Sequence, residues 1–159
     1  MRTVTPSTAI LRRAWNTMSK VPGGSRAFSK MVGKMAPYTG SIGARIVELR
    51  DGYGRAELLD RKQVRNHLDS VHAIALANFG EVISGVTMLY SLDPKMRAIL
   101  TGMRIEYLKK ARGTLTAECY VEPITEVKDM EITLDVAISN AAGEVVCRVY
   151  PEWKVGPKK

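Results

Sequence analysis

Residues 71–90 read VHAIALANFGEVISGVTMLY, a segment that is apolar on nearly every side and contains no proline. A helix on a protein surface carries its apolar side chains in one stripe, whereas a helix that is apolar all round is enclosed by other structure. We therefore predict one long buried helix here, with Asp69 or Ser70 as its N-cap. The rest of the chain has to cover it.

The other segments supply that cover as strands, because apolar and polar residues alternate in them with the period of a half-buried strand. Before the helix, residues 42–50 and 53–60 flank a tight-turn signal at Asp51-Gly52, which predicts a hairpin. After the helix we predict a four-stranded antiparallel meander. Its strands are expected at residues 103–111, 115–121, 130–138 and 145–155.

Two amphipathic helices are expected at the N-terminus. They span residues 7–20, with Ser7 available as an N-cap, and residues 25–35, which Pro37 would end. Both are basic on the polar face, and such helices can lie on anionic membranes. Covering the domain's own core is the commoner role, and we adopt that interpretation.

The predicted order of elements indicates a single α+β domain over residues 1–159. An N-terminal helical extension occupies residues 1–39, and the core at residues 40–155 is an antiparallel sheet wrapped around one long central helix. Such a sheet has one face and two edges that need cover, which subunit pairing can supply. We expect a homodimer or a dimer of dimers.

Composition restricts the partners and the compartment. The formal net charge of +8 favours an anionic partner, but the basic residues are scattered and no nucleic-acid-binding motif accompanies them, so no nucleic acid is predicted. Cys119 and Cys147 fall on apolar strand faces, which indicates buried thiols and a cytoplasmic protein. No segment reads as a secretory signal or a membrane span.

Polar residues in and before the apolar helix are the candidate catalytic groups. Glu81 must find a partner or take up a proton, and a raised carboxylate pKa is common in general bases. The alternative is that Glu81 pairs with a buried arginine or reaches the surface at the helix edge. At the helix start, the Ala73 amide has no internal acceptor and can bind an oxyanion. His72 and Asn66 lie beside it, although a satisfied structural histidine is the alternative for His72.

Distance constrains how these groups can cooperate. Nine residues separate His72 from Glu81, which places them on the order of 13 Å apart at the rise of an α-helix. They cannot act on one atom from the same subunit. If both belong to one site, the glutamate comes from a second subunit whose helix packs alongside, and activity requires the dimer.

The spacing of Asn66, His72 and Glu81 resembles that of the hotdog-fold acyl-CoA thioesterases, especially the phenylacetic-acid-pathway type and a related group of small proteins described as a domain of unknown function. In that family a loop asparagine precedes the histidine of a His-Gly-Gly segment by six residues, and an acidic residue of the central helix follows nine residues later. The resemblance covers residues 40–155 and implies the hotdog fold.

The resemblance also implies hydrolysis of an acyl-CoA or a related acyl thioester. Glu81 would activate water or attack the thioester carbonyl, and the Ala73 amide would polarise that carbonyl. Asn66 would orient water or substrate, and His72 would hold the thioester end. Coenzyme A is expected as part of the substrate, and the candidates to bind its phosphates are Lys109, Lys110 and Arg112. The alternative is that these exposed cations are only solvated. No metal and no separate cofactor is implied.

Two departures from the family pattern bear on turnover. The His-Gly-Gly segment has become His72-Ala73-Ile74, and the commoner aspartate has become Glu81. Side chains on Ala73 and Ile74 limit how closely a thioester can approach the helix start. A non-catalytic acyl-CoA or fatty-acyl binding protein is therefore the alternative function. In either case Met88 and Leu89 would help to line the acyl pocket, unless they simply fill the core.

Overall fold

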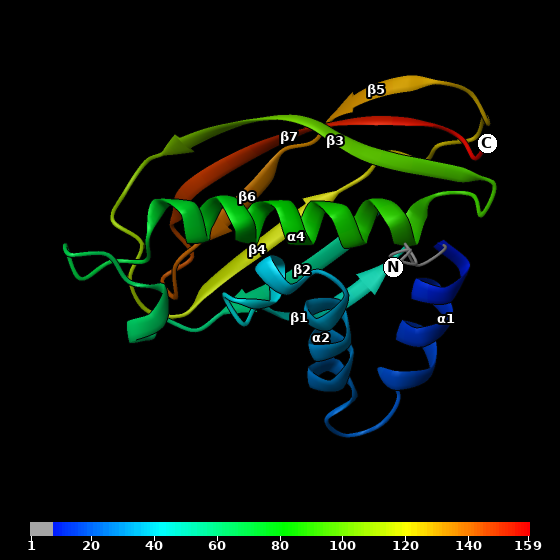
Figure 1. Cartoon of the computed structure of the whole chain (residues 1–159). Helices are drawn as coiled ribbons and strands as arrows, with labels where there is room; N and C mark the ends of the chain where they lie inside the picture. Colours follow the sequence, from blue (N-terminus) through cyan, green and yellow to red (C-terminus); the bar gives the residue numbers. More distant parts are fainter. Residues whose placement is uncertain (1–7) are drawn as a thin grey trace.

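A seven-stranded antiparallel sheet curves around one long helix in the computed structural model, which describes residues 8–159 (Figure 1). The predicted N-cap Ser7 lies outside the described residues. The elements follow in the order α1 (Thr8–Met18), α2 (Gly24–Met35), α3 (Pro37–Gly40), β1 (Arg45–Arg50), β2 (Tyr53–Leu58), the short 3-10 helix η1 (Lys62–Val64), α4 (Ala73–Ser91), β3 (Met96–Tyr107), β4 (Leu115–Tyr120), β5 (Met130–Thr133), β6 (Val136–Ser139) and β7 (Val145–Pro157).

The sheet order corrects the predicted meander. The strands lie in the order β1-β2-β4-β6-β7-β3, with β5 also paired to β7. The strand after the helix, β3, therefore does not pair with β4 but lies beyond β7 at the edge of the sheet. Alternation of apolar residues specifies the buried face of a strand, but it does not specify which strand lies beside it.

The predicted strand at residues 130–138 is present as two short strands in one register. Met130 of β5 is opposite Val155 of β7, and Val136 of β6 is opposite Val149 of β7. The pairing with β7 therefore continues in the same register through both strands. Between them the Leu134 amide donates to the carbonyl of Pro151 at 3.0 Å. Pro151 has no amide hydrogen to return, which interrupts the ladder at this point.

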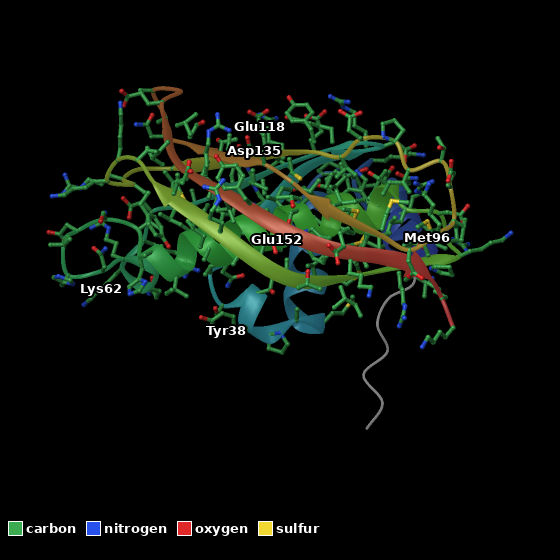
Figure 2. The ribbon with its side chains drawn as sticks, turned by 90° about the horizontal axis from the view of Figure 1, so that it is seen from above. Tyr38, Lys62, Met96, Glu118, Asp135 and Glu152 are labelled. Atoms are coloured by element: carbon green, nitrogen blue, oxygen red, sulfur yellow. The ribbon has the colours of Figure 1, made fainter. Side chains whose placement is uncertain are left out.

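Glycines let α4 lie very close to the sheet. A Cβ atom on Gly80 would lie 2.5 Å from the Cβ atom of Val149 in β7, so no larger residue fits without a shift. By length and composition α4 is apolar enough to cross a membrane, but most of it is buried inside this protein. Seen from above, β3 and β7 lie across α4 (Figure 2). The buried helix predicted from the sequence is thus the core of the domain.

The N-terminal helices cover the flank of the core, as predicted. The Trp15 indole of α1 packs edge-on against Phe28 of α2 with ring centroids 5.1 Å apart, and its Nε1 donates to the Leu49 carbonyl of β1 at 3.0 Å. Arg12 Nε donates to the Tyr90 carbonyl of α4 at 2.8 Å. Pro37 follows the end of α2, as expected, but it also starts α3, because proline suits the first turn of a helix.

Candidate active site

The helix α4 begins later than predicted, and its cap is a different residue. Val71 is extended, since it bridges Arg65 and donates its amide to the Ala111 carbonyl at 2.8 Å. Neither Asp69 nor Ser70 is the N-cap. His72 caps the helix instead, because its Nδ1 accepts a hydrogen bond from the Ile74 amide at 3.0 Å.

This cap defines the state of the His72 ring. Because Nδ1 accepts a hydrogen bond, the neutral imidazole carries its proton on Nε2. The side chain is exposed, so Nε2 can donate to a ligand at the helix start. His72 therefore has a structural role, which was the alternative considered above, and keeps one free donor.

Asn66 organises the loop before the helix. Its Oδ1 accepts from the Leu68 amide at 2.9 Å and from the Ser70 amide and hydroxyl at 3.3 and 3.2 Å. Its Nδ2 has no hydrogen-bond partner within residues 8–159. Asn66 can thus offer a substrate a donor, while its acceptor is occupied by the loop.

The amide of Ala73 is the first of α4 and has no acceptor in the part of the chain that the structure describes. The Ile74 amide is already used by the cap, whereas the Ala73 amide is free to donate to an oxyanion. Tyr107, at the end of β3, donates its hydroxyl to the Ala73 carbonyl at 3.1 Å. That contact fixes the edge strand to the first turn of the helix.

Glu81 lies two turns further along α4, largely buried. Burial raises the pKa of this carboxyl group above its ordinary value. No arginine or other hydrogen-bond partner reaches it among the described residues, so the predicted alternative of a buried arginine pair is wrong. A carboxylate desolvated in this way is a stronger base than one in water.

Trp153 of β7 lies beside Glu81. A Cβ atom on Gly85 would be 3.3 Å from the indole Cη2 of Trp153 and 3.7 Å from Oε1 of Glu81, so both side chains border the same point on the helix. The indole Nε1 is buried and has no partner within the described residues. The ring of Trp153 therefore borders the same part of α4 as the carboxylate.

An apolar surface, only half covered, runs alongside Glu81. The β3 residues that face α4 are opposite buried residues of β7: Met103 opposes Pro151 and is 37% exposed, and Tyr107 opposes Cys147 and is 51% exposed. In sequence order, this β3–α4 surface consists of Ile74, Glu81, Leu89, Leu100, Met103, Ile105 and Tyr107. The outer edge of β3 has no partner strand within the described residues.

The cations expected to bind phosphates are not equivalent. Lys109 forms an ion pair with Glu144 at 2.6 Å. Arg112 donates to the carbonyls of Asp69 and Leu68 at 3.0 and 3.1 Å, so it holds the loop before α4. Lys110 is exposed and unpaired within the described chain.

The structure groups the predicted residues in two places. Asn66 lies in the hydrogen-bonded loop that leads into α4, and His72 and Ala73 lie at the start of the helix, whereas the unbroken helix keeps Glu81 away from that start. Met88 is completely buried and belongs to the core. Sequence reasoning missed Tyr107 and Trp153, because only the β3–β7 pairing brings these residues to the helix.

The comparisons with known proteins identify the family. The chain belongs to the family described as a domain of unknown function (DUF4442), whose profile matches residues 24–155. No curated protein is a significant match.

Solved structures confirm the hotdog fold. The structural-genomics protein APC5556 is 31% identical with a TM-score of 0.80, over 93% of this chain and 99% of that one. PA5026 from Pseudomonas aeruginosa, described as a probable thioesterase, is 23% identical with a TM-score of 0.74, over 84% and 94%. Thioesterase HI1161 from Haemophilus influenzae is 13% identical with a TM-score of 0.66, over 76% and 82%.

Proposed function

We propose that the protein is a cytoplasmic thioesterase that hydrolyses acyl-CoA or a related acyl thioester at sites shared by two subunits. The observation that carries this proposal is Glu81, an unpartnered carboxylate with a raised pKa beside a half-covered apolar surface. Neighbours of the same fold that are named thioesterases support the type of reaction.

The separation of the two groups supports a dimer if both act at one site. The Ala73 amide and Glu81 are on one continuous helix, about 12 Å apart along its axis at about 1.5 Å per residue. A second copy that packs on the β3–α4 surface would cover its apolar residues and bring its own Glu81 toward the first subunit's helix start. Each dimer would then hold two equivalent sites.

In this arrangement Glu81 takes a proton from water as the water oxygen attacks the thioester carbonyl carbon. The carbonyl oxygen gains negative charge and accepts a hydrogen bond from the Ala73 amide. The carbon–sulfur bond then breaks, and the thiolate leaves with the proton returned to it. The free donors on Asn66 and His72 would hold the substrate, and Lys110 is the cation left for a phosphate of coenzyme A.

A non-catalytic acyl-binding protein is the second candidate. The observation in its favour is Ile74, which is 53% exposed at the helix start, at the position of a glycine in the hotdog acyl-CoA thioesterases that the sequence resembles. Its branched side chain would hold a thioester further from the Ala73 amide.

Free-thiol release from short, long and aromatic acyl-CoA esters distinguishes the two candidates, with wild type and Glu81→Gln compared at equal folded concentration. We expect turnover that falls at least a hundredfold in the variant. Binding of the esters by the wild type without hydrolysis of any of them would establish the binding protein instead.

A further inference from the structure

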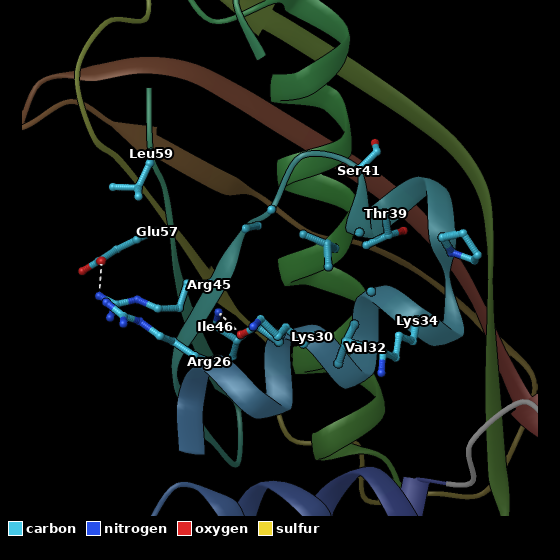
Figure 3. Close-up of a pocket in the computed structure, with 17 residues that line it drawn as sticks. Arg26, Lys30, Val32, Lys34, Thr39, Ser41, Arg45, Ile46, Glu57 and Leu59 are labelled. Atoms are coloured by element: carbon cyan, nitrogen blue, oxygen red, sulfur yellow. Dashed lines mark hydrogen bonds and ion pairs between the residues drawn. The ribbon is translucent and has the colours of Figure 1, made fainter. Parts of the chain in front are cut away.

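A groove of about 820 Å³ lies between α2, α3 and β1 and has its floor on α4 (Figure 3). Its floor includes the buried side chains of Val32, Ile46 and Val82. Although Val82 follows Glu81 in sequence, successive helical residues point about 100° apart. None of the residues of the proposed thioester site lines this groove.

The walls of the groove are held in place without a ligand. Ser29 of α2 accepts a hydrogen bond from the Ile46 amide of β1 at 2.9 Å and donates to the Ser25 carbonyl at 2.8 Å. On the other side, Asn78 of α4 donates to the Tyr38 carbonyl of α3 at 3.1 Å. The groove is therefore preformed, as small-molecule sites usually are.

Three cations of α2 line the groove. Arg26, Lys30 and Lys34 are four residues apart, so they share one face of the helix. All three are exposed, and none forms an ion pair within residues 8–159. Like charges at this spacing disfavour a helix, so their arrangement does not stabilise the protein by itself.

The net positive charge of the chain comes from its N-terminal part, which includes α2. Residues 1–47 contain eight basic residues and no acidic one, while the other sixteen basic residues are balanced by the sixteen acidic ones. The carboxylate that lines the groove, Glu57, is paired with Arg45 at 2.5 Å. A concave site whose charges have one sign raises the local concentration of ligands of the opposite sign.

We propose that this groove binds a single-chain amphiphile with an anionic head group, either a carboxylate or a phosphate. The chain would lie on the apolar floor, and the head group would be held by Arg26, Lys30 and Lys34. The volume is in the range of small-molecule pockets. An apolar floor under a basic rim is complementary to a ligand that has both an apolar chain and an anionic end. The site is independent of the proposed hydrolysis.

The test uses the fluorescent fatty acid 11-(dansylamino)undecanoic acid, with competitors below their micellar concentrations. We expect dodecanoate and dodecyl phosphate to displace it at least tenfold better than dodecanol or inorganic phosphate. A carboxylate-only or phosphate-only preference would identify the head group. Equal displacement by dodecanol would overturn the proposal.

Variants locate the site. The triple variant R26Q/K30Q/K34Q is expected to bind the probe at least tenfold more weakly, with a Tm no lower than wild type because repulsion is relieved. The matched variant K20Q/K62Q/K154Q, which removes the same charge elsewhere, should bind like wild type. Ala44→Trp should fill the groove and abolish binding while circular dichroism stays native.

Three results would contradict the proposal. The first is equal weakening by the two triple variants, and the second is full binding by a folded Ala44→Trp protein. The third is co-sedimentation with phosphatidylglycerol vesicles that R26Q/K30Q/K34Q abolishes, without any probe binding in solution. That result would assign the cations to a membrane surface.

Discussion

The close contact between Gly80 and Val149 predicts that a larger residue at position 80 lowers the stability of the protein. With alanine at position 80, the new Cβ would lie 2.5 Å from both Cβ and Cγ2 of Val149, whereas carbon atoms in contact are about 3.5–4.0 Å apart. Relieving such an overlap costs about 1–3 kcal/mol. Alanine favours a helix over glycine by about 1 kcal/mol, so Gly80→Ala should lower the free energy of unfolding by up to about 2 kcal/mol.

Gly85→Ala is the matched control in the same helix. Its new Cβ would meet the Trp153 ring edge at 3.3 Å, a contact that a small shift relieves. The stabilisation from alanine in a helix then remains, and the unfolding free energies of the two variants should differ by about 1–3 kcal/mol. Urea unfolding followed by circular dichroism, at one protein concentration and with unchanged m-values, measures this difference. Equal stability of the two variants would refute the close packing of α4 on β7.

Four further changes test the site. His72→Ala should cost about 0.5–2 kcal/mol of unfolding free energy, while His72→Asn restores the cap; equal losses in thermal unfolding would rule out capping. Ala73→Pro removes the amide hydrogen at a position that accepts proline, so turnover should fall about 10²–10³-fold with the fold intact; unchanged turnover would dismiss this amide. Since burial raises the Glu81 pKa above 4.5, ionisation opposes folding as pH rises; urea unfolding should show Glu81→Gln stabilising the protein at pH 7–8 but not below about pH 4. Met103→Glu should dissociate the proposed dimer in light scattering, whereas Val127→Glu, a loop control, should not; a dimeric Met103→Glu protein would exclude this surface.

Helices and strands with a long periodic pattern could be predicted from the sequence. The elements that lie beside them in the fold could not. The helix at 71–90 and the buried face of the strand at 130–138 follow from apolar spacing. The interruption of that strand comes from Pro151 on another strand, which the local pattern cannot indicate. The wrong meander has the same cause, because nothing in residues 96–107 specifies β7 as the partner.

In the candidate site, too, some features could be predicted from the sequence and others only from the structure. The spacing of Asn66, His72 and Glu81 was readable, and so was the cost of burying a carboxylate. Histidine is not among the preferred N-cap residues, so the cap was assigned to Asp69 or Ser70. The absence of acidic residues before Glu48 was visible in the sequence. Its link to ligand binding required the structure, which shows the groove that α2 lines.

The most direct test of the central claim is a mixed dimer in which one subunit carries Glu81→Gln and the other carries Ala73→Pro. The two chains are co-expressed with different tags, and the mixed species is isolated through both tags. If each site combines Glu81 of one subunit with the Ala73 amide of the other, one site is intact and the other carries both changes. The mixed dimer should then have about half the wild-type rate of thioester hydrolysis, although each parent dimer is nearly inactive. A mixed dimer as inactive as its parents would show that both groups act within one subunit, and would contradict the shared site.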